Sequence, residues 1–442
     1  MKKRFLRCIF PLFSLFLTTA LVIPSAAQTI TAVNAEKAAI VSLINSYDDT
    51  DTTFSVAAER KLKNVNGESS YTYYALRPYG YAVLRNDNHV LSEACFQENA
   101  TLPIDWNDST QYYYVGPSML ATRQDGALRL NDGTVLADEA LTSIRQTEGL
   151  LAAEENALGN FTSVSPSATP IAPSVVAKSV HPEYFTKLTN AFGFNGQGTC
   201  TVLAACILLG FYDTFVHDKY VGAGYRTAET SVQSAGTTEA FHQLLCDFVY
   251  GNGPVGGIHI HNAINGFNNY LARQEMSIRF DSNTTESVST VRAKVITMIE
   301  RGHPLIASMG TNYGADIDHT VVVYGYRVTS TPGGGGAEFS SVGTNGTSTS
   351  TYRVHYGWHD TLSDVWVSSA WFYRYGALAD CVLNNAHIMD SLGYVQDYHS
   401  GDQHFFLEKK ACSSCGGNTT STWVSFPCNG RCGAISALDL AS

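Results

Sequence analysis

Residues 197–211 read QGTCTVLAACILLGF, so a polar, glycine-containing approach leads directly into an apolar run. The run Thr201–Phe215 predicts a buried helix, which places Cys200 at the helix N-terminus. The free backbone N–H groups and the dipole at that end stabilise a thiolate, and so they lower the pKa of the cysteine. Cys200 is therefore the candidate nucleophile. Cys206 lies inside the apolar run, and we expect it to be a buried structural cysteine.

Helices precede strands in the residues that follow. Thr238–Val249 and Glu286–Arg301 show the apolar spacing of helices. Four strand-like runs come after them, at Pro304–Met309, Thr320–Arg327, Tyr352–Tyr356 and Val365–Phe372. A helix-rich half followed by a strand-rich half predicts an α+β fold with an antiparallel sheet across residues 180–406. The Gly-, Ser- and Thr-rich segment 329–351 is expected to be a surface insertion, because it lacks the Lys-Ser/Thr pair of a phosphate loop.

The residues before this domain divide into a leader, a first domain and a linker. Residues 1–27 combine four basic residues, an apolar run and small residues at the end, which predicts a secretory signal peptide cleaved after Ala27. Residues 28–161 predict a first domain, with helices at Val33–Tyr47 and Asp138–Leu158, strands at Tyr71–Leu84 and Asn88–Phe96, and an aromatic-rich stretch at Tyr112–Val115. Residues 162–179 are rich in Ser, Pro, Ala and Val, and they predict an extended linker that proteases can reach.

Composition narrows the class of protein. The chain has 442 residues, 44% of them hydrophobic and 15% charged, with a net charge of −11 that becomes −15 without the four basic residues of the leader. Such high hydrophobicity and sparse charge exclude a disordered chain. The acidic balance argues against a nucleic-acid partner. No run after the leader is long and apolar enough to span a bilayer, so we expect a secreted, extracellular protein with no membrane span in its mature form.

A thiol nucleophile needs a base, and the cysteine count fits a free thiol. Ten cysteines are present and Cys8 belongs to the leader, so nine remain and at least one stays unpaired or pairs between chains. His319 is the candidate base, because it stands directly ahead of a strand that can present its imidazole to a cleft. A cysteine followed at a distance by a histidine is the order expected of such a pair. Gln197 offers an amide N–H that could stabilise an oxyanion beside the Cys200 N–H.

Two other groups of residues are candidates for metal binding. The tail, residues 407–442, carries Cys412-x-x-Cys415-Gly and Cys428-x-x-x-Cys432-Gly. Four thiolates at this spacing could hold a structural zinc ion, and two disulfides are an equal alternative in an exported protein. His259 and His261 alternate on a strand-like stretch. We expect them to line a cleft or the surface, since no acidic or cysteine partner is near them in sequence.

Three short stretches resemble the papain-like cysteine peptidases, and their pattern is most similar to streptopain and to bacteriocin-processing-peptidase-like proteins of bacteria. Residues 198–205 look like the nucleophile helix of that family. Residues 304–307 and 318–326 look like the paired strands that carry the base. Residues 354–358, with the sequence VHYGW, look like the strand that carries an Asn next to a Trp-Gly motif. The order and spacing agree over roughly residues 181–375.

The resemblance implies a catalytic pair, Cys200 and His319, and a third residue that orients the histidine. His355 stands where the family has Asn, and it could accept the His319 N–H in place of that amide. Asp360 and Asp364 are the alternatives. The nucleophile and base contribute more than the orienting group, so a pair without a third member can still be active.

The resemblance also implies an oxyanion donor and a residue that shields the pair. Gln197 lies nearer the cysteine than the corresponding Gln of papain, which leaves Asn195 as a competing oxyanion donor. Trp358 is expected to shield the pair. The chemistry implied by the resemblance requires no cofactor, so any zinc in the tail would be structural.

The resemblance also implies a role for residues 28–161. Peptidases of the streptopain type carry an N-terminal inhibitory prodomain, and Tyr74–Leu84 looks like part of one. The first domain would then be an intramolecular inhibitor, and residues 162–179 the activation segment; an ordinary substrate-binding or adhesive module is the alternative. The prediction is a secreted cysteine peptidase that is made as a zymogen and acts on protein or peptide substrates. A papain-like amidase or transglutaminase acting on cell-wall peptides, and a non-catalytic surface-binding protein on a degenerate peptidase scaffold, remain alternatives.

Overall fold

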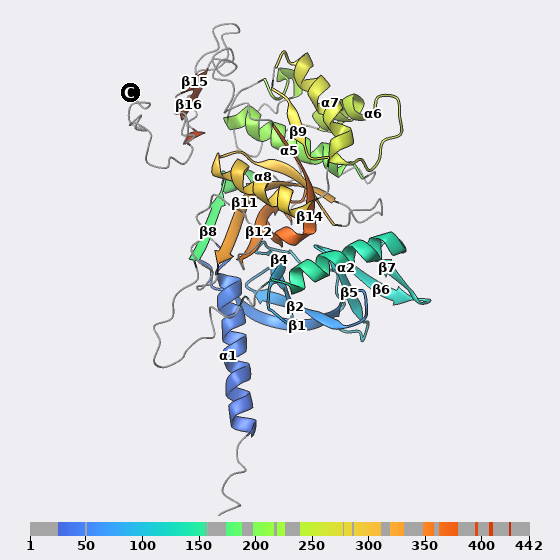
Figure 1. Ribbon diagram of the computed structural model, residues 1–442, viewed down its shortest axis with the longest axis vertical. Coiled ribbons are helices and arrows are strands. Elements are labelled where there is room, and N and C mark those ends of the chain that lie inside the picture. Colours follow the sequence, from blue (N-terminus) through green and yellow to red (C-terminus); the bar gives the residue numbers. More distant parts are fainter. Residues whose placement is uncertain are drawn as a thin grey trace, which may run out of the picture.

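Figure 1 shows the computed structural model of the chain, in which two regions share one central sheet. The structure describes residues 25–48, 51–154, 157, 174–187, 198–215, 219–225, 239–276, 278–284, 287–310, 319–330, 348–357, 362–378, 394–396, 406–409 and 424–425. These residues form a 14-stranded, mostly antiparallel sheet, a separate three-stranded sheet and seven helices. The prediction of an α+β fold with an antiparallel sheet is therefore confirmed. Within the described residues, no helix combines the length and apolarity needed to cross a membrane.

The N-terminal region supplies one half of the large sheet. Its elements are α1 (Ser25–Asn45), β1 (Ser55–Lys63), β2 (Ser69–Arg77), β3 (Tyr81–Arg85), β4 (Leu91–Cys95), β5 (Tyr112–Gly116), β6 (Met119–Gln124), β7 (Ala127–Leu130) and α2 (Asp138–Ala152). The single strand predicted at Tyr71–Leu84 is wrong, because Pro78 and Gly80 divide it into β2 and β3. Gly80 has φ +87°, and a Cβ there would lie 2.2 Å from the Cys95 carbonyl oxygen, so the turn requires glycine.

The C-terminal region supplies the other half. Its elements are β8 (Ser174–Ser179), α4 (Pro182–Lys187), α5 (Cys200–Phe215), the short 3-10 turn η1 (Ala223–Tyr225), α6 (Glu239–Tyr250), α7 (Ile260–Arg273), β9 (Phe280–Ser282), α8 (Val288–Glu300), β10 (Leu305–Met309), β11 (His319–Ser330), β12 (Ser348–His355), β13 (Val365–Ser368), the 3-10 turn η3 (Ser369–Trp371) and β14 (Phe372–Leu378). The small second sheet contains β15 (Tyr394–Gln396), β16 (Phe406–Lys409) and β17 (Val424–Ser425). The helices predicted around residues 201–215, 238–249 and 286–301 are confirmed as α5, α6 and α8.

Three predictions for this region are corrected. The linker predicted at 162–179 ends in a strand, since β8 pairs with β11 along its whole length. The run Val365–Phe372 is broken by η3, so it contributes to two strands instead of one. The stretch with His259 and His261 is the start of helix α7 and not a strand, because Ile260, Ile264, Phe267 and Leu271 repeat at helical spacing and are all buried.

Helix α5 lies at the centre of the C-terminal region. Every residue from Thr201 to Asp213 is buried, and the helix packs against β10 and β11 with α6 and α7 beside it. Burying each large apolar side chain, such as Leu203, Ile207 and Phe211, contributes about 1.5–3 kcal/mol to stability. Because α5 is buried on all sides, its sequence is apolar all round instead of along one face. Its N-terminus is thereby held against the beginning of β11.

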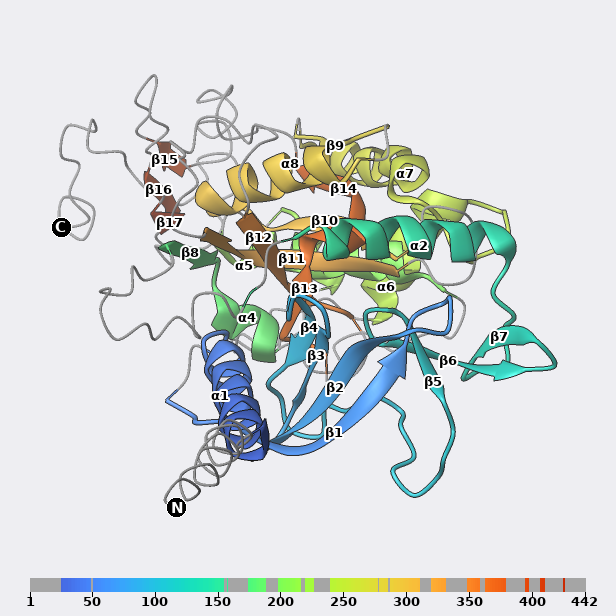
Figure 2. The same cartoon turned by 60° about the horizontal axis from the view of Figure 1, so that its bottom comes forward.

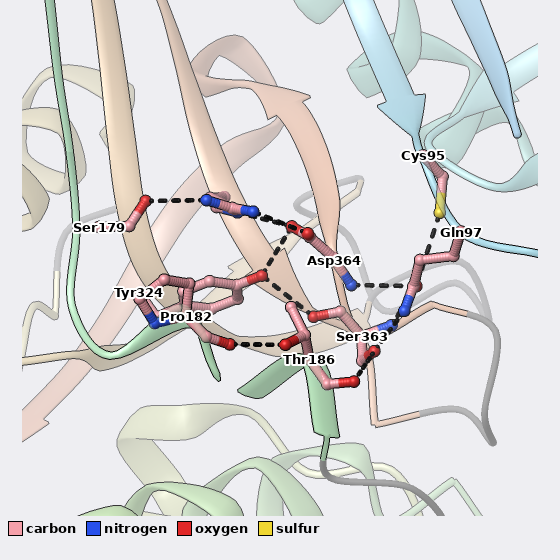
Figure 3. Close-up of polar contacts among 9 residues, drawn as sticks. Cys95, Gln97, Ser179, Pro182, Thr186, Tyr324, Ser363 and Asp364 are labelled. Atoms are coloured by element: carbon pink, nitrogen blue, oxygen red, sulfur yellow. Dashed lines mark hydrogen bonds and ion pairs between the residues drawn. The ribbon is translucent and has the colours of Figure 1, made fainter. Parts of the chain in front are cut away.

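The two regions are joined by strand pairing. β4 pairs with β13 in the register Cys95 to Val365, Ala94 to Trp366 and Glu93 to Val367, and Figure 2 shows the two strands side by side. Figure 3 shows the side chain of Gln97 reaching from the N-terminal region to Ser363 and Asp364. Its Oε1 accepts the Ser363 and Asp364 N–H groups at 2.9 and 3.1 Å. The strands described within residues 28–161 therefore belong to the same sheet as those of the C-terminal region.

Candidate active site

Cys200 is the first residue of α5, as the sequence predicts. Thr199 precedes it as the N-cap: its carbonyl accepts the Leu203 N–H at 2.9 Å, and its hydroxyl shares a 3.0 Å hydrogen bond with Nε2 of His242 on α6. Gly198 has φ +74° and lies close to the backbone of Gly257, so the chain enters the helix through a left-handed turn. The position of Cys200 is thus set by backbone geometry and by a buried hydrogen bond.

A chain of hydroxyl groups fastens the start of α5 to the start of β11. The Thr201 hydroxyl donates to the Ile258 carbonyl at 2.6 Å and lies 2.9 Å from the hydroxyl of Thr320. Thr320 also lies 3.3 Å from the Ser308 hydroxyl on β10. Because Thr201 follows Cys200 and Thr320 follows His319, these contacts bring together two candidate catalytic residues that are 119 residues apart in the sequence.

The imidazole of His319 favours the thiolate form of Cys200. Burial is the largest single influence and raises the pKa of this thiol, but the hydrogen bond and the charge of His319, together with the Thr320 N–H and the Thr201 side chain, lower it by more in sum. The net result is a Cys200 pKa of about 7, against an ordinary value of 9.0. A cysteine with such a pKa is substantially a thiolate at neutral pH, which is the reactive form.

His319 is held by the backbone. Its Nε2 lies 2.7 Å from the carbonyl oxygen of Tyr356, and its ring stacks on the Tyr356 ring at a centroid distance of 5.6 Å. A carbonyl can only accept, so Nε2 carries the hydrogen and Nδ1 is left for the thiol. The imidazole is 6% exposed, which restricts its rotation. Tyr356 was not identified from the sequence as part of the site; its position one residue after His355 is the only signal that points to it.

Two of the side chains predicted to orient His319, those of His355 and Asp364, contact other groups. His355 is buried, and its Nδ1 accepts the Gly357 N–H at 3.0 Å, a bond that shapes the turn after β12. Both carboxylate oxygens of Asp364 are bound by Arg353, at 2.6 and 2.8 Å, and the Tyr324 hydroxyl donates to one of them at 2.8 Å. Figure 3 shows Asp364 in this network, beside Tyr324 and Ser363. The Tyr356 carbonyl is a hydrogen-bond partner of the His319 imidazole.

Several predicted site residues lie outside the described residues. They are Gln197 and Asn195, the two candidate oxyanion donors, together with Trp358, Asp360 and the tail cysteines Cys412, Cys415, Cys428 and Cys432. Their roles, including zinc or disulfides in the tail, stay predictions. Within the part of the chain that is described, no group of three or more His, Cys, Asp or Glu side chains could hold a metal ion.

The remaining cysteines and histidines differ from the pair in their surroundings. Cys95, Cys206 and Cys246 are buried, and burial raises the pKa of their thiols, so they are poor nucleophiles. His259 and His261 stack on each other at 5.8 Å, and Arg374 donates to Nδ1 of His261 at 2.9 Å. Burial and the charge of Arg374 lower the pKa of both histidines.

Comparison with known proteins adds nothing to this geometry. No protein-family model matches the chain, and no curated protein matches it. Function is therefore inferred from the arrangement of Cys200, His319 and Tyr356.

Proposed function

We propose that this chain is a cysteine peptidase with a papain-like catalytic domain, exported and made as a zymogen. One observation carries the proposal: a cysteine with a pKa of about 7 stands at a helix N-terminus against a histidine whose other ring nitrogen is bound. A helix N-terminus, a thiolate and an oriented imidazole together supply a nucleophile, a base and a donor for an oxyanion.

The pair supports acyl transfer in two steps. The Cys200 thiolate attacks the carbonyl carbon of a peptide bond, a C–S bond forms, and the Cys200 N–H and the Gln197 amide stabilise the oxyanion. His319 then protonates the leaving nitrogen as the C–N bond breaks, which leaves a thioester. Water attacks this thioester while His319 takes its proton, and the C–S bond breaks to release a carboxylate and regenerate the thiol.

Activation would follow a cut between the two regions. Because β8 pairs with β11 from Ser174 to Ser179, a cut on the C-terminal side of Ser174 would break the sheet. We therefore place the activation cleavage within residues 158–173, a shorter segment than the predicted linker. N-terminal sequencing of the large fragment tests this placement, and a fragment that begins after Ser179 would contradict it.

The proposed function is tested with the chain from Gln28 onward. We expect the wild type to cleave itself between the regions, to hydrolyse unstructured protein substrates and to be labelled at Cys200 by a thiol-reactive peptide probe. Cys200→Ala should abolish all three, whereas Cys206→Ala, a buried cysteine further along the same helix, should retain them. Identical behaviour of wild type and Cys200→Ala, with no labelling of either, would exclude a peptidase. Transfer of the acyl group to an added amine instead of water would indicate a transglutaminase.

A further inference from the structure

Three polar side chains lie in a row across β11, β10 and β14. Thr320 of β11 is paired with Ser308 of β10, and Ser308 is paired with Arg374 of β14. Residues directly opposite each other in antiparallel strands have their side chains on the same face of the sheet. The Thr320 hydroxyl lies 3.3 Å from that of Ser308 and 2.9 Å from that of Thr201 on α5. Arg374 is therefore on the face of the sheet that carries the start of α5.

The first turn of α7 rests on the same face, next to Arg374. A Cβ added at Gly376 would lie 2.7 Å from Cγ2 of Ile260, so α7 contacts β14 directly. His261, the next residue of α7, accepts a hydrogen bond at Nδ1 from the guanidinium of Arg374 at 2.9 Å. The ring of His259 stacks on that of His261 at a centroid distance of 5.8 Å. The guanidinium and the two imidazoles form one group, which we call the Arg374 cluster.

The chain that leads into this cluster borders the start of α5. The Thr201 hydroxyl donates to the carbonyl of Ile258 at 2.6 Å, and Ile258 directly precedes His259. A Cβ added at Gly198 would lie 3.5 Å from the backbone nitrogen of Gly257. Residues 257–259 are therefore fixed beside the residues on both sides of Cys200.

The spacing of the strands gives the distance from the cluster to the catalytic pair. Neighbouring strands lie about 4.8 Å apart, so the backbone of Arg374, two strands away from Thr320, is about 10 Å from it. An extended peptide advances about 3.3 Å per residue. The cluster thus lies about three residues along a peptide from a bond that is held at Cys200.

The backbone of Arg374 is fixed on both sides by one buried side chain. Asn283 donates from Nδ2 to the Tyr373 carbonyl at 3.3 Å, and its Oδ1 accepts the Tyr375 N–H at 2.7 Å. The guanidinium also lies 5.7 Å from the centroid of the Tyr373 ring. A guanidinium that is held in this way loses little freedom when it binds a planar anion.

The Arg374 cluster combines a lasting positive charge with N–H donors. A guanidinium stays protonated at any pH relevant to a protein. Because Nδ1 of His261 accepts from Arg374, the hydrogen of that imidazole is on Nε2, which is a donor. Burial and the charge of Arg374 also lower the pKa of His261, so the ring is neutral at neutral pH and its hydrogen bond does not cancel the charge of the guanidinium. Both histidines are partly exposed, so a ligand can reach them.

We propose that Arg374, His261 and His259 form a subsite for a carboxylate of the peptide substrate. The guanidinium would donate charge-assisted hydrogen bonds to the carboxylate, and Nε2 of His261 would add a neutral one. The proposal rests on the proposed function and names the class of substrate: peptides with Asp or Glu, or a free carboxyl terminus, about three residues from the cleaved bond.

The test compares quenched fluorescent peptides that differ by one group. One series carries a single Glu at successive positions up to about three residues from the cleaved bond on either side, and a matched series carries Gln there. A further pair differs only in a free or an amidated carboxyl terminus, which separates a chain end from an acidic side chain. With the chain from Gln28 onward, kcat/KM for one of the carboxylate peptides should exceed that of its neutral match about tenfold, the effect of one hydrogen bond to a charged group.

Three variants locate the source of this preference. Arg374→Gln should bring the ratio of the two kcat/KM values close to one, and His261→Ala should lower the ratio in part. Lys294→Gln is the matched control. Lys294 lies over the ring of Tyr375, the next residue of β14, whose side chain is on the opposite face of the sheet, and it pairs with Asp281 at 3.8 Å. This variant also removes one positive charge beside β14, but it should retain the wild-type ratio.

Equal kcat/KM values for every matched pair in the wild type would overturn the proposal. This result needs no variant, so the test stays decisive even where Arg374→Gln fails to fold. A preference that persists in folded Arg374→Gln, or that falls equally in Lys294→Gln, would overturn the proposal as well.

Failure of the subsite and failure of the proposed function give different results. Cleavage without any preference for a carboxylate would leave the peptidase standing and exclude the subsite. If the wild type cleaves no peptide, binding of the same peptides, labelled with the fluorophore alone, is measured by fluorescence anisotropy with the Cys200→Ala chain. Tighter binding of a carboxylate peptide that is lost on adding Arg374→Gln would then support the subsite and exclude the peptidase, and equal binding of the matched peptides would exclude both.

Discussion

The carbonyl oxygen of Tyr356 lies 2.7 Å from Nε2 of His319, so a backbone group occupies the place predicted for a third catalytic side chain. A carbonyl accepts a hydrogen bond at any pH, and this one belongs to a buried residue that directly follows β12. His319 is thereby kept with Nδ1 toward Cys200. An imidazole held in this way needs no Asn, Asp or second His to select its tautomer.

The reactivity of Cys200 should depend on pH with an apparent pKa of about 7. Below that pH the thiolate is protonated and its alkylation should slow about tenfold per unit. His319→Ala removes the main group that lowers the pKa and leaves burial, which raises it, so the apparent pKa should move to 9.0 or above. Site-specific alkylation measured across this range checks both values. His89→Ala, a histidine of the N-terminal region, is the control, and a similar loss in that variant would contradict the assignment.

Asp364→Asn should affect stability and leave the Cys200 thiolate pKa unchanged. The carboxylate is bound by Arg353 at 2.6 Å in a largely buried ion pair, with side-chain exposures of 9% and 18% for Arg353 and Asp364. Removing one partner of such a pair costs about 3–5 kcal/mol. Denaturant unfolding measures the stability, and alkylation of the remaining folded protein measures the pKa. A raised thiolate pKa with little loss of stability would instead favour Asp364 as the group that orients His319.

A cut in the linker should not separate the two regions. A protease site inserted among residues 162–170 would allow cleavage on demand, but the β4–β13 ladder, the Gln97 bridge and the Trp371 to Ser92 bond remain intact. The two fragments should elute together from a sizing column under native conditions and separate only in denaturant. Rapid dissociation of the N-terminal fragment after cleavage would show that the shared sheet depends on the covalent link.

Gly80→Ala should destabilise the chain strongly. A Cβ at this position would lie 2.2 Å from the Cys95 carbonyl at the edge of the ladder that joins the regions, and φ is +87°. Gly126→Ala is the matched control, because its φ is +82° but no atom lies within 4 Å of a Cβ there. The control should cost only the backbone term, about 1–2 kcal/mol, and Gly80→Ala clearly more. Equal thermal shifts for the two variants would mean that the close contact at Cys95 relaxes freely.

Local patterns in the sequence were sufficient to predict the two elements that begin at Cys200 and His319. The apolar run after Cys200 predicts α5, and the β-branched run after His319 predicts β11, because each element is buried and its pattern reflects that burial directly. The boundaries were less accurate where a turn interrupts an apolar run. Pro78 and Gly80 divide β2 from β3, and η3 divides β13 from β14, although the residues on both sides remain buried.

The amino-acid pattern alone thus specifies the α+β class, the helix that begins at Cys200 and the strand that begins at His319, since hydrophobic periodicity and end signals are local properties. The pairing of β4 with β13, the Tyr356 carbonyl on His319 and the hydrogen bond from the Ser118 N–H to Glu93 depend on the tertiary structure. Each joins residues far apart in sequence, and backbone carbonyls and amides are the same at every position. The residue pattern therefore does not show which carbonyl and amide groups will form contacts in the fold.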